Sequence, residues 1–145
     1  MPAGAASGET LKDISSWDKV LMLTRAALEK KACDLVVLDV HEHTSIADYF
    51  IVCSGRSDRQ VQSIAQGLEE ESGEEGIKPF AVEGAQRGHW VLMDFSDVIV
   101  HIFYEPVRQF YDLDGLWGHA PIAKLPETYA KLITQFQASD ERLSS

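Results

Sequence analysis

The spacing of apolar residues predicts a helix near the start of the chain. Between Trp17 and Leu28, apolar or small residues recur every three or four positions, which gives a helix one side that can face a core. Ser15 or Ser16 precedes this stripe, where a serine side chain can accept a hydrogen bond from the first turn. We therefore predict a helix that begins there and ends near Lys31.

A second stripe with helical spacing runs from Val61 to Leu68. Ser57 stands before it and Gln60 follows three residues later, which is a capping-box pattern. Five glutamates then occur between positions 69 and 75. Because carboxylates oppose the helix dipole at a C-terminus, we expect this end of the helix to fray early.

Five apolar stretches have the length and composition of strands. The last two meet at a polar four-residue corner, Asp94 to Asp97, so they should form a β-hairpin. Both hairpin strands are apolar at successive positions, which predicts cover on both faces. Pro79 places the third stretch at a sheet edge or at a strand start. The predicted strands cover residues 35–40, 49–53, 78–82, 90–93 and 98–103.

The order of these elements indicates the fold class. A short helix should begin near Pro106 and end before Gly115, and another helix should follow Pro126. The succession of helix, two strands, helix, three strands and short helix predicts an α/β sandwich. Its mixed sheet of about five strands would be flanked by helices, with a C-terminal helical extension.

The chain length of 145 residues suits one domain. We expect a disordered N-terminal segment at residues 1–13, an α/β domain at 14–118 and a C-terminal extension with a short helix at 119–145. No apolar run approaches the roughly 20 residues of a membrane span. The first residues lack the pattern of a signal or transit peptide, so the cytoplasm is the expected compartment.

A formal net charge of −10 restricts the kind of partner. It disfavours direct contact with nucleic-acid phosphates and favours attraction of a basic protein. The chain has two cysteines, Cys33 and Cys53, too few for a disulfide framework at this length. Cys53 lies in an apolar strand, so we expect a buried thiol there.

Two stretches could carry catalysis or metal binding. Gly55–Ser57 lies between a strand and a helix, where a phosphate or a nucleophile could be held. The known phosphate-binding and nucleophile-elbow patterns are absent, however, and a helix cap already accounts for Ser57. His41 and His43 share a face of an extended segment, but no motif supplies further metal ligands.

Two pairs of carboxylates could hold Mg²⁺, as in nucleotide-transferring enzymes. Turn formation explains the first pair, Asp94 and Asp97. The second pair, Asp112 and Asp114, would point apart on a helical turn. We therefore expect no metal, no cofactor and no catalytic residue.

Large amphipathic rings gather around the hairpin and the short helix. They are Trp90, Tyr104, Tyr111 and Trp117. Core packing explains some of them, but tryptophan and tyrosine are also the usual anchors of protein interfaces. The nearby carboxylates of Asp94, Asp97 and Glu105 favour an interface with a cationic protein.

Several short motifs follow one another in a known order. They are Leu38–Val40, Ser45–Asp48, Cys53–Gly55 with Ser57, Arg59 and Gln60, Val82–Gly84, Trp90, Asp94, Asp97–His101, Tyr111 with Leu113, and Leu116–Trp117. Together they make residues 14–117 resemble the ribosomal silencing factor family, also called the Iojap family. One departure is Asp114, where the family commonly has glutamate.

This resemblance implies a fold similar to that of nucleotidyltransferases, without their catalysis. It implies binding to the large ribosomal subunit through large-subunit ribosomal protein fourteen, which sterically blocks joining of the small subunit when nutrients are scarce. It also implies self-association as a homodimer, with little direct nucleic-acid contact and no membrane.

The resemblance also implies residue roles. Trp90 matches a tryptophan of the family's ribosome-facing side and is the expected anchor. Asp94, Asp97, Glu105 and Tyr111 are expected to contact lysine or arginine of the ribosomal protein. For His101, a partner contact and a hydrogen-bonded place in the core both remain open.

Two other functions remain as alternatives. A nucleotidyltransferase-like enzyme would bind nucleotide with Gly55, Ser57 and the nearby carboxylates. A structural dimer would use the aromatic residues for self-association alone.

Overall fold

The computed structural model describes residues 14–111, 119–129 and 131–132, and for Phe110 and Tyr111 it describes the backbone alone. Its elements follow the predicted order. They are α2 (Ser16–Glu29), β1 (Cys33–Asp39), β2 (Tyr49–Gly55), α3 (Asp58–Glu74), β3 (Ala81–Glu83), β4 (Trp90–Asp94), β5 (Val98–Tyr104) and α4 (Glu105–Tyr111). The predicted N-terminal disorder concerns residues outside the described part of the chain.

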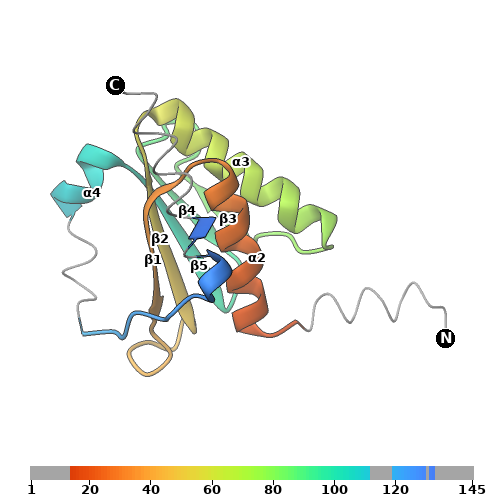
Figure 1. Ribbon diagram of the computed structural model, residues 1–145. Coiled ribbons are helices and arrows are strands. Elements are labelled where there is room, and N and C mark those ends of the chain that lie inside the picture. The colour runs from red at the N-terminus through yellow and green to blue at the C-terminus, as the bar shows by residue number, and fades with distance from the viewer. Residues whose placement is uncertain (1–13, 112–118, 130, 133–145) are drawn as a thin grey trace.

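The five strands form one mixed sheet in the order β1-β2-β5-β4-β3. β2 and β5 are parallel, and the other neighbouring pairs are antiparallel. Helices α2 and α3 lie on one side of this sheet, and α4 projects on the other side from the end of β5 (Figure 1). The predicted α/β class with a five-stranded mixed sheet is therefore confirmed.

Serine caps begin both long helices. The Ser15 side chain accepts a hydrogen bond from the Asp18 N–H at 3.1 Å, and Ser57 accepts one from the Gln60 N–H at 3.0 Å. The Gln60 side chain in turn accepts from the Arg56 N–H at 2.7 Å, one residue before the position of a capping box. Both caps remove unpaired N–H groups from helix starts, as the sequence predicts.

The acidic end of α3 does not fray early, because the helix continues through Gly73 to Glu74. Buried Ser72 explains the difference. Its hydroxyl donates to the Glu69 carbonyl at 3.2 Å, and its own carbonyl accepts from the Ile77 N–H at 2.8 Å. These contacts satisfy carbonyl groups of the last turn and bring Ile77 into the core, which outweighs the unfavourable charges.

The sheet has a core on each of its faces. The inner face, covered by α2 and α3, contributes Val37, Ile51, Cys53, Val91, Met93, Val98, Val100 and Ile102 to the larger core. The opposite face, called the outer face below, carries Leu38, Phe50, Val52, Trp90, Leu92, Asp94, Ile99, His101 and Phe103. The thiol of Cys53 is fully buried, as predicted, and burial raises its pKa to about 12.

The hairpin strands differ in how they are covered. β5 is buried on both faces, as predicted. In β4, buried Val91 and Met93 alternate with half-buried Trp90, Leu92 and Asp94. The expectation that both faces of this strand are covered is therefore wrong, because α3 packs on its inner face while its outer face stays partly open.

The sequence suggested a polar hairpin turn, but the turn also contains an apolar side chain that is buried. Phe95 is 1% exposed and belongs to the inner core. Its N–H donates to the Val98 carbonyl at 2.9 Å, while the Asp94 carboxylate accepts from the Ser96 N–H at 2.8 Å. Ser96 takes the left-handed conformation, with a φ of 78°. An apolar side chain thus enters the core between the polar residues of the turn.

The start of the C-terminal segment lies along β1. The Asp39 N–H donates to the Pro121 carbonyl at 2.9 Å, and the Ala123 N–H donates to the Val37 carbonyl at 2.8 Å. Residues 127–129 and 131–132 are helical, in agreement with the predicted helix after Pro126. Gly115, Leu116 and Trp117 lie outside the described residues. In the described part of the chain, no helix is long and apolar enough to cross a membrane.

Candidate protein-binding face

An aromatic cluster occupies the part of the outer face where β4 and β5 pair. Trp90 is opposite Phe103 in the register, and their rings stack with centroids 5.0 Å apart. His101 lies two residues from Phe103 and contacts Phe50 edge-on at 5.2 Å. Since cross-strand neighbours share a face of the sheet, the alternation of β4 and β5 brings these rings together.

Trp90 and His101 are joined by a hydrogen bond. The indole Nε1–H donates to Nδ1 of His101 at 3.2 Å. Nδ1 must then be the unprotonated nitrogen, so the neutral ring carries its hydrogen on Nε2. The His101 side chain is 6% exposed, and burial lowers its pKa to about 4. At neutral pH, the Trp90 indole N–H therefore donates to an uncharged imidazole ring.

The outer face brings together three of the residues predicted to bind a partner: Trp90, Asp94 and His101. Trp90 and Asp94 lie at opposite ends of β4, with Leu92 between them on the same face. Trp90, Leu92 and Asp94 are half-buried, whereas His101, which is opposite Leu92 on β5, is buried. A partner on this face would meet an aromatic ring, an aliphatic side chain and a carboxylate.

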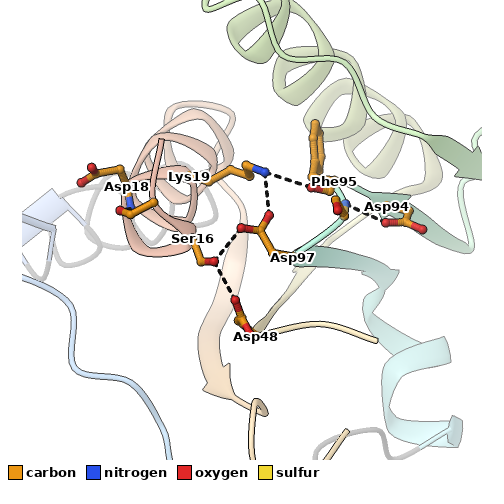
Figure 2. A network of polar contacts seen from close by, with 9 residues as sticks. Ser16, Asp18, Lys19, Asp48, Asp94, Phe95 and Asp97 are labelled. Atoms are coloured by element: carbon orange, nitrogen blue, oxygen red, sulfur yellow. Dashed lines mark hydrogen bonds and ion pairs between the residues drawn. The ribbon is translucent and has the colours of Figure 1, made fainter. Parts of the chain in front are cut away.

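Asp97 lies away from this group, toward α2 (Figure 2). Its carboxylate accepts from Lys19 Nζ at 2.6 Å and from the Ser16 hydroxyl at 2.5 Å. Ser16 is also 2.7 Å from the Asp48 carboxylate, and Lys19 donates to the Phe95 carbonyl at 3.1 Å. Partial burial opposes ionisation of Asp97, but the hydrogen bonds from Lys19 and Ser16 outweigh it and lower the pKa of this carboxyl.

Glu105 lies at the other end of β5, where it begins α4. It borders a shallow cavity of about 460 Å³ together with Arg108 and Asp34. Arg108 donates to the Asp34 carbonyl at 2.7 Å and to the Ser54 hydroxyl at 2.9 Å. Asp97 and Glu105 thus stand at opposite ends of one strand. Tyr111 ends α4, and its side chain lies outside the described residues.

The stretch Gly55–Ser57 is explained by packing. A Cβ atom at Gly55 would lie 2.8 Å from Cγ2 of Val61, so glycine lets the end of β2 approach the first turn of α3. Ser57 is occupied as the cap of α3. Both residues thus have structural roles in this arrangement.

The described residues contain no group of three or more histidine, cysteine, aspartate or glutamate side chains that could hold a metal ion. Asp94 and Asp97 point to different partners, as described above. Nδ1–H of His41 donates a hydrogen bond to the Asp39 carboxylate, and this hydrogen bond raises the pKa of His41. Asp112 and Asp114 lie outside the described residues.

The sequence patterns did not predict the contact between Lys19 and Asp97. Lys19 is 8% exposed, because its stem lies in the buried side of α2 while its ammonium group meets Asp97. A lysine next to the apolar stripe is the available signal, since a buried ammonium group requires a partner. Leu92 was also missed as a member of the outer face, although its two-residue spacing from Trp90 places both on one side of a strand.

The comparisons with known proteins agree on one family. The family profile described as "Ribosomal silencing factor during starvation" matches residues 13–144. Ribosomal silencing factor RsfS of Bacillus subtilis is 42% identical over 107 residues, which cover 73% of this chain and 91% of that protein. The chloroplastic protein Iojap of Zea mays is 35% identical over 104 residues, covering 72% of this chain and 45% of that protein.

Solved structures show the same relationship. A crystal structure of a Chromobacterium violaceum protein matches with a TM-score of 0.71 and 32% identity, covering 78% of this chain and 91% of that one. A Bacillus halodurans structure matches with a TM-score of 0.65 and 37% identity, covering 74% of this chain and 99% of that one. These matches confirm the resemblance found in the sequence motifs. The chain belongs to the ribosomal silencing factor family.

Proposed function

We propose that this protein represses translation by binding the large ribosomal subunit through large-subunit ribosomal protein fourteen. Bound there, it occupies space that the small subunit needs, so the two subunits fail to join and translation slows under nutrient limitation. The membership of the family supports the ribosomal role. The proposed partner also sets the compartment, because the protein acts where ribosomal subunits meet, in the cytoplasm.

The outer face is the proposed contact surface. The observation that carries this assignment is the half-buried Trp90, held by a stack on Phe103 and a hydrogen bond to His101. A tryptophan whose ring is already oriented loses little entropy on binding, and such residues dominate interface energies. Leu92 and Asp94 on the same strand extend the surface with apolar and anionic groups.

The charge of the chain supports a cationic protein partner. The net charge of −10 repels phosphate groups, so direct contact with ribosomal RNA should be minor. Asp94 lies on the outer face, and its carboxylate is the proposed partner of a lysine or arginine. Asp97 and Glu105 lie at the two ends of β5 and stay predicted contacts at the border of the surface, as does Tyr111.

The proposed mechanism needs no chemical step. Ser57 serves as a helix cap, and the Lys19–Asp97 pair ties α2 to the hairpin turn. Inhibition then depends on affinity and on the volume of the bound protein. We also propose that the protein self-associates as a homodimer, as the family resemblance implies.

Co-sedimentation with purified large subunits tests the contact surface. We expect Trp90→Ala to weaken binding by roughly 30-fold or more, because an interface tryptophan commonly contributes at least 2 kcal/mol. Phe80→Ala is the matched control, since Phe80 is 80% exposed and lies beside Lys19 and Phe95 on the α2 side of the sheet. Full binding by the Trp90 variant would refute the assignment of the outer face.

A further inference from the structure

A histidine is energetically unfavourable at position 101. His101 stands between Ile99 and Phe103 on the outer face and is 6% exposed. Its Nε2 atom is buried and has no hydrogen-bond partner among the residues that the structure describes. A buried polar hydrogen without an acceptor destabilises the folded state, and a phenylalanine would fill the space without that cost. Core packing alone therefore does not explain a histidine here.

The other ring nitrogen of His101, Nδ1, does form a hydrogen bond. Nδ1 accepts the Trp90 indole N–H at 3.2 Å, and the Trp90 ring also stacks on Phe103 at 5.0 Å. The stack fixes the plane of the indole, but it does not favour one of the two flipped orientations. The hydrogen bond does, because only one orientation directs Nε1–H toward His101.

The His101 ring is itself well fixed. Phe50 meets it edge-on at 5.2 Å, and Phe103 lies nearly parallel to it at 6.3 Å. An acceptor on a buried, packed ring cannot follow a moving indole, so it selects one position for the partly exposed Trp90. Burial also keeps the ring neutral, which preserves Nδ1 as an acceptor.

We propose that His101 is a positioning residue that sets the orientation of the Trp90 indole for docking on the large subunit. The inference rests on the proposed function, in which Trp90 is the anchor. It resolves the two roles left open for His101: the residue lies in the core and acts on the interface through Trp90. Without His101, the indole would lose the hydrogen bond that favours this orientation, and binding would be weaker.

A double-mutant cycle tests this role through binding to purified large subunits. His101→Phe keeps a flat ring but removes the acceptor, and we expect it to weaken binding about tenfold, from one lost hydrogen bond and the freed rotation. Trp90→Phe has no N–H group to orient. In that background, His101→Phe should change the affinity less than about twofold, since the two residues act as one unit.

Two further measurements separate positioning from a structural role. His101→Asn carries a side-chain oxygen near the position of Nδ1, so it should recover most of the affinity that His101→Phe loses. In NMR spectra of the full chain without ribosomes, the Trp90 indole N–H signal, assigned by its loss in Trp90→Phe, should move upfield in His101→Phe. The melting temperature of that variant should equal or exceed that of the wild type, because a buried unpaired N–H is removed.

Each outcome decides between the possibilities. Unchanged binding by His101→Phe, with Trp90→Ala defective, would overturn the positioning role and leave the proposed function intact. Equal losses in both Trp90 backgrounds would show that His101 acts through the fold alone, and would also overturn it. Full binding by Trp90→Ala would overturn the anchor itself and with it the positioning role. If His101→Phe fails to fold, His101→Asn with a wild-type indole signal supports the proposal, and a shifted signal with full affinity contradicts it.

Discussion

Lys19 and Asp97 are 78 residues apart in the sequence and form an ion pair with 2.6 Å between Nζ and Oδ1. The pair joins the first turn of α2 to the turn that precedes β5 (Figure 2). The Ser16 hydroxyl and the Phe95 carbonyl complete the contacts around it. The hairpin turn is therefore held to the helical layer by charge as well as by the apolar Phe95 ring.

This pair predicts a specific pattern of stability changes. Asp97→Asn should lower the free energy of unfolding by about 2 kcal/mol, because it leaves a nearly buried ammonium group without its counter-charge. The loss is at the low end for buried pairs since the Asp97 side chain is 31% exposed. Adding Lys19→Met should recover most of it, because an apolar side chain then fills the site. Urea unfolding measures both changes.

The exposed pair Arg25–Glu29 is the matched control for this cycle. Glu29→Gln should change the free energy of unfolding by less than about 0.5 kcal/mol. A similar loss for Asp97→Asn and Glu29→Gln would mean that the Lys19–Asp97 pair has no special role in stability.

His101 predicts a dependence of stability on pH. Its pKa is about 4 in the folded protein and near 6.5 in an unfolded chain, so the unfolded state binds the extra proton between these values. Stability should therefore fall as the pH decreases from about 6.5 toward 4, by up to about 3 kcal/mol. Urea unfolding at several pH values measures this slope.

His101→Phe provides the comparison for the pH series, because all other titrating groups are common to both proteins. The difference in unfolding free energy between wild type and variant should change with pH in the window from 4 to 6.5 and stay constant above it. A difference that does not vary with pH would show that the folded protein accepts the proton on His101 at little cost.

If the outer face is the contact surface, a charged side chain at position 92 should weaken binding to the large subunit. Leu92→Glu places a carboxylate in the middle of the proposed contact surface, where docking would remove its water. We expect binding to the large subunit to fall by about 100-fold, with a small effect on stability because the side chain is half-buried in the free protein. Phe80→Glu adds the same charge away from the outer face and should bind normally. Equal losses from both variants would assign the effect to net charge.

Local signals in the sequence predicted most of the fold. Ser57 and Gln60 define the start of α3 because capping depends on nearby residues, and apolar runs define the strands for the same reason. The predictions were wrong where contacts between residues distant in the sequence determine the local structure. Ser72 holds the end of α3 against its charges through the packing of Ile77, and Phe95 turns inward because the core has space for it.

The site was predictable only in part. The two-residue alternation of β4 and β5 places Trp90 near His101, so their proximity could be predicted from a hairpin register. The separation of Asp97 from Asp94 could not, because it depends on Lys19, which reaches the turn from α2. Residues that share a turn in sequence can thus face different layers of the fold.

The most direct test of the proposed function is a subunit-joining assay. Purified large and small subunits are mixed in the presence of the protein, and formation of whole ribosomes is followed by light scattering. The wild type and Phe80→Ala should reduce joining in proportion to the large subunits that they occupy, whereas Trp90→Ala should have no effect at the same concentration. Normal joining of large subunits that are saturated with the wild-type protein would contradict the proposed function.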